Sequence, residues 1–110
     1  MPRYLHQFSY TTESLKAMTT APSDRRAAAE KLMSAAGGKL LDLYYCFGEY
    51  DGIAISEFPA NVDVAAGILA AGASGGFSQM KTTVLITMDE AKEAMEKAGK
   101  AAASYTPPAG

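Results

Sequence analysis

Segments with the two-residue period of a strand alternate along this chain with segments that have the spacing of a helix. Their order constrains the fold more than any other feature. Four segments are predicted as strands: residues 3–10, 39–47, 50–58 and 77–88. Helices are predicted at residues 22–36, 62–73 and 89–104, with a short helical turn after Thr11.

Local signals support these boundaries. Gly37-Gly38 ends the first long helix, because glycine tolerates the left-handed conformation that follows many helices. Gly48-Glu49 fits a tight hairpin, Asn61 can cap the helix that follows, and residues 87–90 match a capping box. The resulting order βαββαβ, followed by a terminal helix, predicts a ferredoxin-like α+β fold, in which a four-stranded antiparallel sheet carries two helices on one face.

The length and composition narrow the class of protein. The 110 residues predict one domain over residues 1–105 and a flexible Pro-rich tail over residues 106–110. A formal net charge of -2 gives no broad basic field, which argues against nucleic-acid binding. The single cysteine, Cys46, excludes an intramolecular disulfide and a cysteine-based zinc site, and we expect no metal and no cofactor. Without a long apolar run or a signal peptide, the chain is expected to be cytoplasmic and to make no membrane contact.

The alternation of side chains along the strands predicts two different sheet faces. The more apolar face is expected to carry the helices: His6, Phe8, Tyr10, Leu41, Leu43, Tyr45, Phe47, Ile53, Ile55, Met80, Val84 and Ile86. The opposite face is mixed: Leu5, Gln7, Ser9, Asp42, Tyr44, Cys46, Ala54, Ser56, Phe58, Gln79, Lys81, Thr83 and Leu85. Two helices cannot cover both faces of four strands. We therefore expect a homodimer or a higher homo-oligomer that is packed through the mixed face.

Several motifs together resemble the GYD-domain family of small bacterial proteins. They are Gly48-Glu49-Tyr50-Asp51, Gly37-Gly38-Lys39, Tyr44-Tyr45, Tyr4 with Tyr10-Thr11, Asp24-Arg25, Glu57 with Pro59, and Lys81-Thr82-Thr83. The resemblance covers residues 2 to about 88 and implies a ferredoxin-like fold that forms a dimeric α+β barrel. It implies no established reaction. The chain departs from the family at Pro59-Ala60-Asn61, where relatives often have Pro-Asp, and in its last helix and Pro-rich tail.

Two residues are candidates for catalytic proton transfer. His6 is the only histidine, and its usual pKa lies near neutrality, so it is a candidate general base or ligand. The alternative is a partly buried structural histidine. Asp51 stands beside Tyr50 at the hairpin, where a buried carboxylate could exchange a proton with a substrate. The alternative is a turn in which Asp51 accepts hydrogen bonds from nearby backbone amides.

Five side chains of the mixed face form the candidate ligand-binding site: Tyr44, Lys81, Gln7, Asp42 and Ser56. In one hypothesis they line a pocket inside a barrel and bind a small aromatic or enol-like molecule, and the protein is a binding protein or a cofactor-independent enzyme. In the alternative they form hydrogen bonds and ion pairs across a dimer interface, Asp42 with Lys81 among them. The protein is then a non-catalytic assembly or regulatory module that uses this face and the terminal helix.

Two features of the helices have structural interpretations. Arg25-Arg26 at the start of the first long helix is typical of a solvated face rather than a phosphate clamp, because no Gly-rich loop joins a strand to it. Gly67 and Gly72 lie inside the second helix, where each costs about 1 kcal/mol relative to alanine. Small residues at these positions are expected to let that helix lie close to the sheet.

Overall fold

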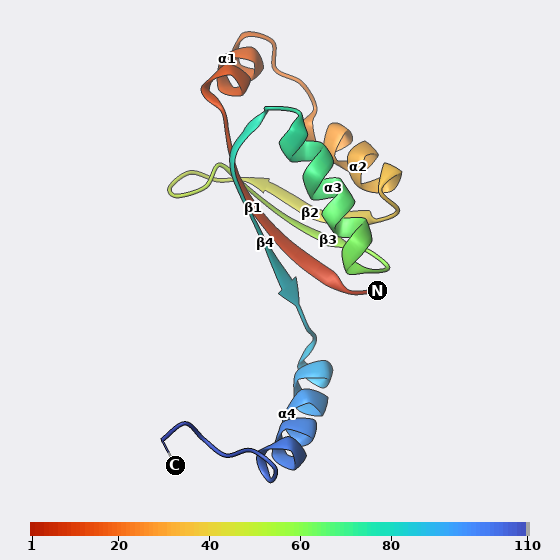
Figure 1. Ribbon diagram of the computed structural model, residues 1–110. Coiled ribbons are helices and arrows are strands. Elements are labelled where there is room, and N and C mark those ends of the chain that lie inside the picture. Colours follow the sequence, from red (N-terminus) through yellow and green to blue (C-terminus); the bar gives the residue numbers. More distant parts are fainter. Residues whose placement is uncertain (110) are drawn as a thin grey trace.

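The computed structural model describes residues 1–109 and contains one four-stranded sheet. Its elements in chain order are β1 (Arg3–Tyr10), α1 (Thr12–Thr20), α2 (Arg25–Ala35), β2 (Lys39–Tyr45), β3 (Gly52–Glu57), α3 (Asn61–Ala73), β4 (Phe77–Leu85) and α4 (Met88–Ala102). The strands pair antiparallel in the order β2-β3-β1-β4, and α2 and α3 lie on the same face of the sheet (Figure 1). This is the predicted ferredoxin-like α+β arrangement. Gly110, the last residue of the predicted tail, lies outside the described residues.

Side-chain caps explain where two of the helices begin. Asp24 caps α2 by accepting the backbone N–H of Ala27 at 3.1 Å, which leaves Pro22 outside the helix. Thr87 and Glu90 form the predicted capping box of α4, with both hydrogen bonds at 3.0 Å. The last helix therefore starts where its local sequence predicts.

Two other helices begin differently from the prediction. Thr11 accepts the backbone N–H of Ser14 at 3.2 Å, and the segment after it forms the full helix α1 instead of a short turn. Ala60, not Asn61, occupies the cap position of α3. Asn61 is the first residue of that helix, and its Oδ1 accepts the hydroxyl of Tyr4 at 2.8 Å. Its side chain is thus used for a long-range contact rather than for a cap.

The connection between β2 and β3 is longer than a tight hairpin. Residues 46–51 form a loop in which Gly48 has a φ of 132°, a conformation that residues with a Cβ rarely adopt. Asp51 ties this loop to β1. Its N–H donates to the carbonyl of Phe8 at 2.9 Å, and its Oδ2 accepts the N–H of Tyr10 at 3.0 Å. The loop is therefore shaped by an attachment to the neighbouring strand.

The prediction for the faces of β3 is wrong. In the register of β1 with β3, His6 is paired with Ala54, so that Ala54 and Ser56 point toward the helices. Ala54 is 3% exposed and Ser56 is fully buried. Ile53 and Ile55 consequently lie on the face that no helix covers.

Side-chain volume explains this reversal. The ring of Phe8 lies over Gly52, and the ring of Phe58 lies against Gly38, so that a Cβ on either glycine would collide with the ring. Gly52 therefore has to stand on the face toward the ring of Phe8. The alternation of β3 then puts Ala54 and Ser56 on that same face and the isoleucines on the other.

The packed core is small and lies around the beginning of β1. Tyr4, Phe58 and Val64 are each at most 5% exposed, and the rings of Tyr4 and Phe58 meet edge to face with their centroids 6.1 Å apart. A shift of register in β2 also buries Leu40, where Leu41 was predicted to face the helices. Partly buried neighbours complete this core: Met33, Ala36 and Ile68.

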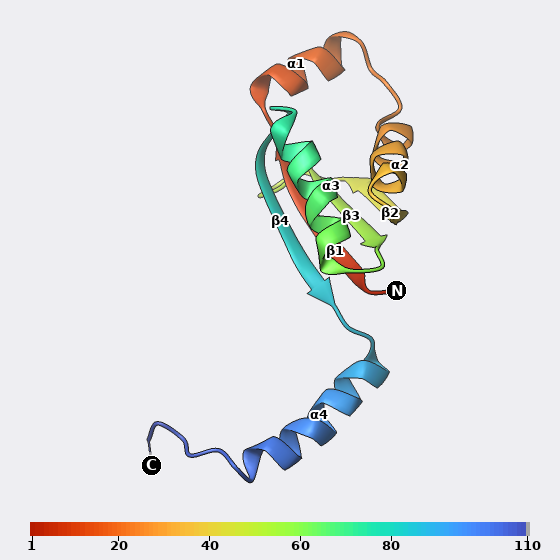
Figure 2. The same cartoon turned by 45° about the vertical axis from the view of Figure 1, so that its right-hand side comes forward.

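The terminal helix α4 extends away from the sheet and the other helices (Figures 1 and 2). The molecule is therefore elongated, with principal extents of 60 × 31 × 22 Å. Apolar residues follow one another along α4 at helical spacing, and two of them, Met88 and Met95, are 81% and 71% exposed. Within residues 1–109, no helix has both the length and the apolar character needed to cross a membrane.

Candidate functional site

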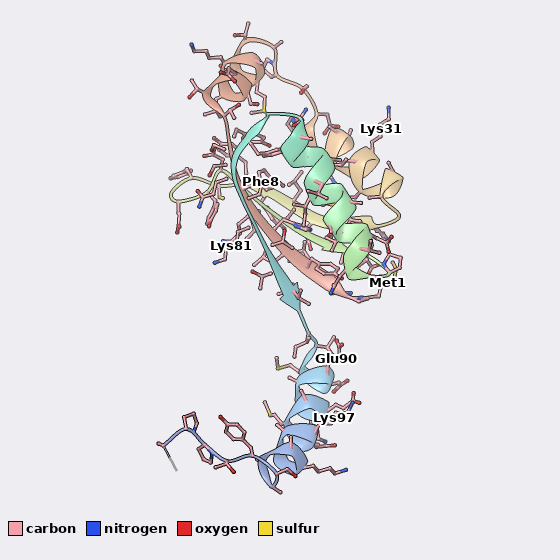
Figure 3. All side chains as sticks on the ribbon, in the orientation of Figure 1. Met1, Phe8, Lys31, Lys81, Glu90 and Lys97 are labelled. Atoms are coloured by element: carbon pink, nitrogen blue, oxygen red, sulfur yellow. The ribbon has the colours of Figure 1, made fainter. Side chains whose placement is uncertain are left out.

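A cavity of about 280 Å³ lies between the helix layer and the sheet. All four strands contribute to its floor, and α2 and α3 form its roof. Core residues Phe58 and Val64 bound one end. Three aromatic rings, those of Phe8, Tyr10 and Phe77, bound the other, with centroids 5.4–5.6 Å apart (Phe8 is labelled in Figure 3). The walls of the cavity are therefore mainly hydrocarbon.

Small residues on both helices leave this space open. The α2 stripe that faces the cavity includes Ala28 and Ala29, and the α3 stripe includes Gly67 and Ala71. Ala28 and Ala29 follow Arg25 by three and four residues, and Ala71 follows Gly67 by four, so each set lies on one side of its helix. The small residues were predicted to bring a helix close to the sheet. Gly67 does lie close to the sheet, since a Cβ at this position would be 3.8 Å from the ring of Phe58. Elsewhere on the two inner stripes the side chains are too short to fill the layer.

His6 is the polar group in the floor of the cavity. Its Nε2 lies 2.7 Å from Ser56 Oγ, and its Nδ1 lies 2.9 Å from Thr82 Oγ1. A neutral imidazole has one N–H donor and one acceptor nitrogen, and each hydroxyl can serve either. The three side chains therefore satisfy one another across β3, β1 and β4.

Burial lowers the pKa of His6 below its ordinary value of 6.5. The ring is 8% exposed, and the layer above it offers no carboxylate to stabilise a positive charge. His6 is thus neutral at physiological pH, as the structural interpretation of this residue requires.

Three of the five residues predicted to bind a ligand lie in one row across the uncovered face. The register pairs Tyr44 with Ile53, Ile53 with Gln7, and Gln7 with Lys81. Tyr44 and Lys81 stand on the edge strands β2 and β4, with two strands between them, where two central strands were expected. Figure 3 shows Lys81 pointing away from α2 and α3. One chain therefore does not gather these groups into a common pocket.

The other two predicted ligand residues are also placed apart. Asp42 lies on the uncovered face of β2, so it cannot pair with Lys81 on the opposite edge of the same sheet. Ser56 lies on the other face, where it contacts His6 beneath the helices. Its predicted face is wrong for the same reason as that of β3 as a whole: Gly52 has to lie beneath the ring of Phe8, which fixes the alternation of the strand.

The second catalytic candidate, Asp51, has the structural role that its alternative interpretation described. Its carboxylate accepts the N–H of Tyr10, and its own carbonyl accepts the N–H of Cys46 at 2.7 Å. Among residues 1–109, Asp51 does not line the cavity. It fastens the loop to β1 and closes the loop on itself through Cys46.

The cavity contains few groups that could take part in a reaction. Ser56 and His6 have the spacing of a nucleophile and its base, but Ser56 is fully buried and a substrate in the cavity does not reach it. In the part of the chain that the structure describes, no three His, Cys, Asp or Glu side chains are grouped to hold a metal ion. The site presents a concave, mainly apolar surface with a neutral imidazole in its floor and Arg25 at its mouth.

The sequence prediction missed this cavity because its residues look like ordinary packing. A usable signal was present: Ala28-Ala29 and Gly67 with Ala71 place small side chains on the inner stripes of both helices. Arg25 is exposed, as predicted, and also stands at the rim of the same cavity, which was not predicted. Thr82, the partner of His6, was predicted only as part of the motif Lys81-Thr82-Thr83.

Comparison with known proteins identifies the family. The sequence pattern of the GYD domain matches residues 4–95, most of the chain. The protein belongs to the GYD-domain family. In this GYD-domain protein the signature Gly48-Glu49-Tyr50-Asp51 is the loop that Asp51 fastens to β1. The family pattern also reaches into the first half of α4.

Solved structures similar to this GYD-domain protein support the fold alone. The structure of FFRP-DM1 is 20% identical with a TM-score of 0.53, and the match covers 78% of this chain and 100% of that one. The hypothetical protein PHS023 from Pyrococcus horikoshii is 18% identical with a TM-score of 0.54, covering 79% and 92%. MtbAldR is 11% identical with a TM-score of 0.52, and the match covers 78% of this chain but 52% of the longer one. None of the curated proteins compared matches the chain.

Proposed function

We propose that this GYD-domain protein binds a small apolar molecule in the cavity between its helices and its sheet. The observation that carries the proposal is the cavity itself: about 280 Å³ in a domain of this size, lined by aromatic and aliphatic side chains. Binding pockets of proteins are concave, mainly apolar, and contain a few fixed polar groups. His6 supplies such a group in the floor, held in place by Ser56 and Thr82.

The exposure of these apolar walls supports the same proposal. The cavity is open to solvent at a mouth where Arg25, Ala28, Ala70 and Ser74 are exposed. A bound hydrocarbon would remove apolar surface from water, which is favourable.

The test uses a neutral apolar probe and a variant that fills the space. We expect 1-octanol to raise the melting temperature of the wild-type protein, because a ligand that binds only the folded state stabilises it. Ala71→Leu places a larger side chain in the cavity, since Ala71 is 8% exposed and lines it. This variant should lose most of the shift.

Ala65→Leu is the matched control, because Ala65 lies on the same helix but is exposed and outside the cavity. It should keep the shift of the wild type. The proposal fails if 1-octanol leaves the wild-type melting temperature unchanged, or if Ala71→Leu and Ala65→Leu respond alike.

We also propose that two copies associate through the uncovered sheet face. This face carries apolar residues at its centre, Leu5 and Ile53 with Ile55, and no helix of the same chain lies on it. Opposite charges stand at its two edges, Asp42 on β2 and Lys81 on β4. A two-fold axis that runs along the strands, between two such faces, places β2 of one copy over β4 of the other, so that these charges approach one another twice.

A further inference from the structure

A second cavity lies against the mouth of the first. Its volume is about 200 Å³, and it is formed where α1 approaches the beginning of α2 and the end of α3. Four residues line both cavities: Tyr10, Arg25, Ser74 and Phe77. Arg25 therefore stands at the junction of the two spaces.

The second cavity differs from the first in polarity. Its walls include the hydroxyl groups of Ser14 and Ser74 and the backbone at Gly76. The first cavity is mainly hydrocarbon, as described above. A molecule that occupied both would need an apolar part for the first cavity and a polar part near Arg25.

The charge at this junction is positive and uncompensated. Within residues 1–109, no carboxylate lies at ion-pair distance from Arg25, and no carboxylate lines either cavity. The neighbouring carboxylate of Asp24 accepts the N–H of Ala27. Arg26, the next residue, pairs instead with Glu30 at 2.8 Å, on the side away from the cavity.

We infer that the ligand of this protein is a small apolar carboxylic acid, whose hydrocarbon or aromatic part fills the first cavity and whose carboxylate binds Arg25 at the junction. The inference rests on the proposed function, because it names the class of ligand for the same cavity. A guanidinium recognises a carboxylate through two parallel N–H bonds. Arg25 is exposed at the mouth of the cavity, so its guanidinium can meet a carboxylate without first losing its contact with water.

His6 does not compete for the carboxylate. Both of its ring nitrogens already bind hydroxyl groups. A neutral imidazole at the floor of the cavity also lacks the charge that favours an anion. The two polar groups thus assign an orientation to the ligand: its apolar end near His6 and its anionic end near Arg25.

The experiment compares sodium octanoate with 1-octanol, which has the same chain length and no charge, by calorimetric titration at pH 8. We expect the wild-type protein to bind octanoate about fivefold more tightly than 1-octanol, which is the upper range for one solvent-exposed ion pair. Arg25→Gln should remove this preference and leave the affinity for 1-octanol unchanged. Arg26→Gln should behave as the wild type, since it removes an adjacent arginine that lines neither cavity.

The outcomes separate this inference from the function on which it rests. If 1-octanol binds but octanoate binds no better, the carboxylic-acid ligand is wrong and the cavity remains a binding site. If octanoate binds better but Arg25→Gln and Arg26→Gln weaken it equally, the assignment to Arg25 is wrong. If neither probe binds the wild-type protein, both proposals are overturned.

Discussion

His6 makes the stability of the folded protein depend on the pH of the solution. Its ring is buried and bonded to Ser56 and Thr82, and burial lowers its pKa below 6.5. In the unfolded chain the ring is free to take up a proton at its ordinary pKa. Between these two pKa values the unfolded chain binds more protons than the folded protein does, so stability falls as the pH decreases.

We therefore predict that the free energy of unfolding is largest above pH 6.5 and decreases as the pH falls through the lower, folded-state pKa of His6. Urea unfolding at pH 8 and at pH 5.5 measures the difference. His6→Gln removes the only histidine of the chain, so the part of the decrease due to this residue should disappear in that variant. An equal decrease in both proteins would refute the assignment.

The residues of the site differ in how well the sequence predicts their positions. Period-two alternation placed His6, Phe8 and Tyr10 on the helix face correctly, because β1 is central and paired on both sides without a shift until Ser9. The same rule applied to β3 chose Ile53 and Ile55 for the core, because it weighs hydrophobicity and ignores volume. The position of Ser56 depended on which residue of β3 lies beneath Phe8 of β1, and that register is a property of two strands at once.

At the scale of elements, the helices divide into those that depend on the sheet and one that does not. α2 and α3 have small residues toward the sheet and enclose the cavity. α4 instead stabilises its own start through the Thr87–Glu90 capping box and an ion pair at 3.4 Å between Glu93 and Lys97. Its start at Met88 was therefore predictable from a few neighbouring residues, whereas the space beneath α2 and α3 was not.

We predict that deleting residues 87–110 leaves the stability of the remaining domain unchanged to within about 0.5 kcal/mol, the usual range for changes away from packed contacts. The hydrogen bonds that the structure gives α4 all lie within residues 87–105. Urea unfolding of the two chains measures this. Val64→Ala, which truncates a side chain that is 5% exposed in the core, should cost about 2 kcal/mol in the same assay. A comparable loss on deleting α4 would show that the helix packs against the domain in solution.

At the scale of the whole molecule, two apolar surfaces are left uncovered within residues 1–109. They are the open sheet face and the stripe of α4 that includes Met88 and Met95. The radius of gyration, 17.9 Å, exceeds the roughly 13 Å of a compact chain of this length. The proposed dimer would cover the first of these surfaces.

We predict that the protein is a dimer at micromolar concentration and that Ile55→Glu makes it a monomer. Ile55 lies near the middle of the open sheet face, where a carboxylate would be buried without a partner. Leu69→Glu is the control, because Leu69 is 72% exposed on α3 on the other side of the sheet. Sedimentation equilibrium distinguishes the species. A monomeric wild-type protein, or dissociation by both substitutions alike, would exclude this interface.

The projection of α4 has a consequence for motion as well as for shape. Within residues 1–109, Ile86 and Thr87 connect the sheet to α4, which projects away from it. A helix that is attached through two residues alone can reorient without moving the sheet. The N–H bonds of α4 would then reorient faster than those of the strands. The amide nitrogen relaxation rates along one chain should therefore fall into two classes, with the boundary at the two residues that join β4 to α4.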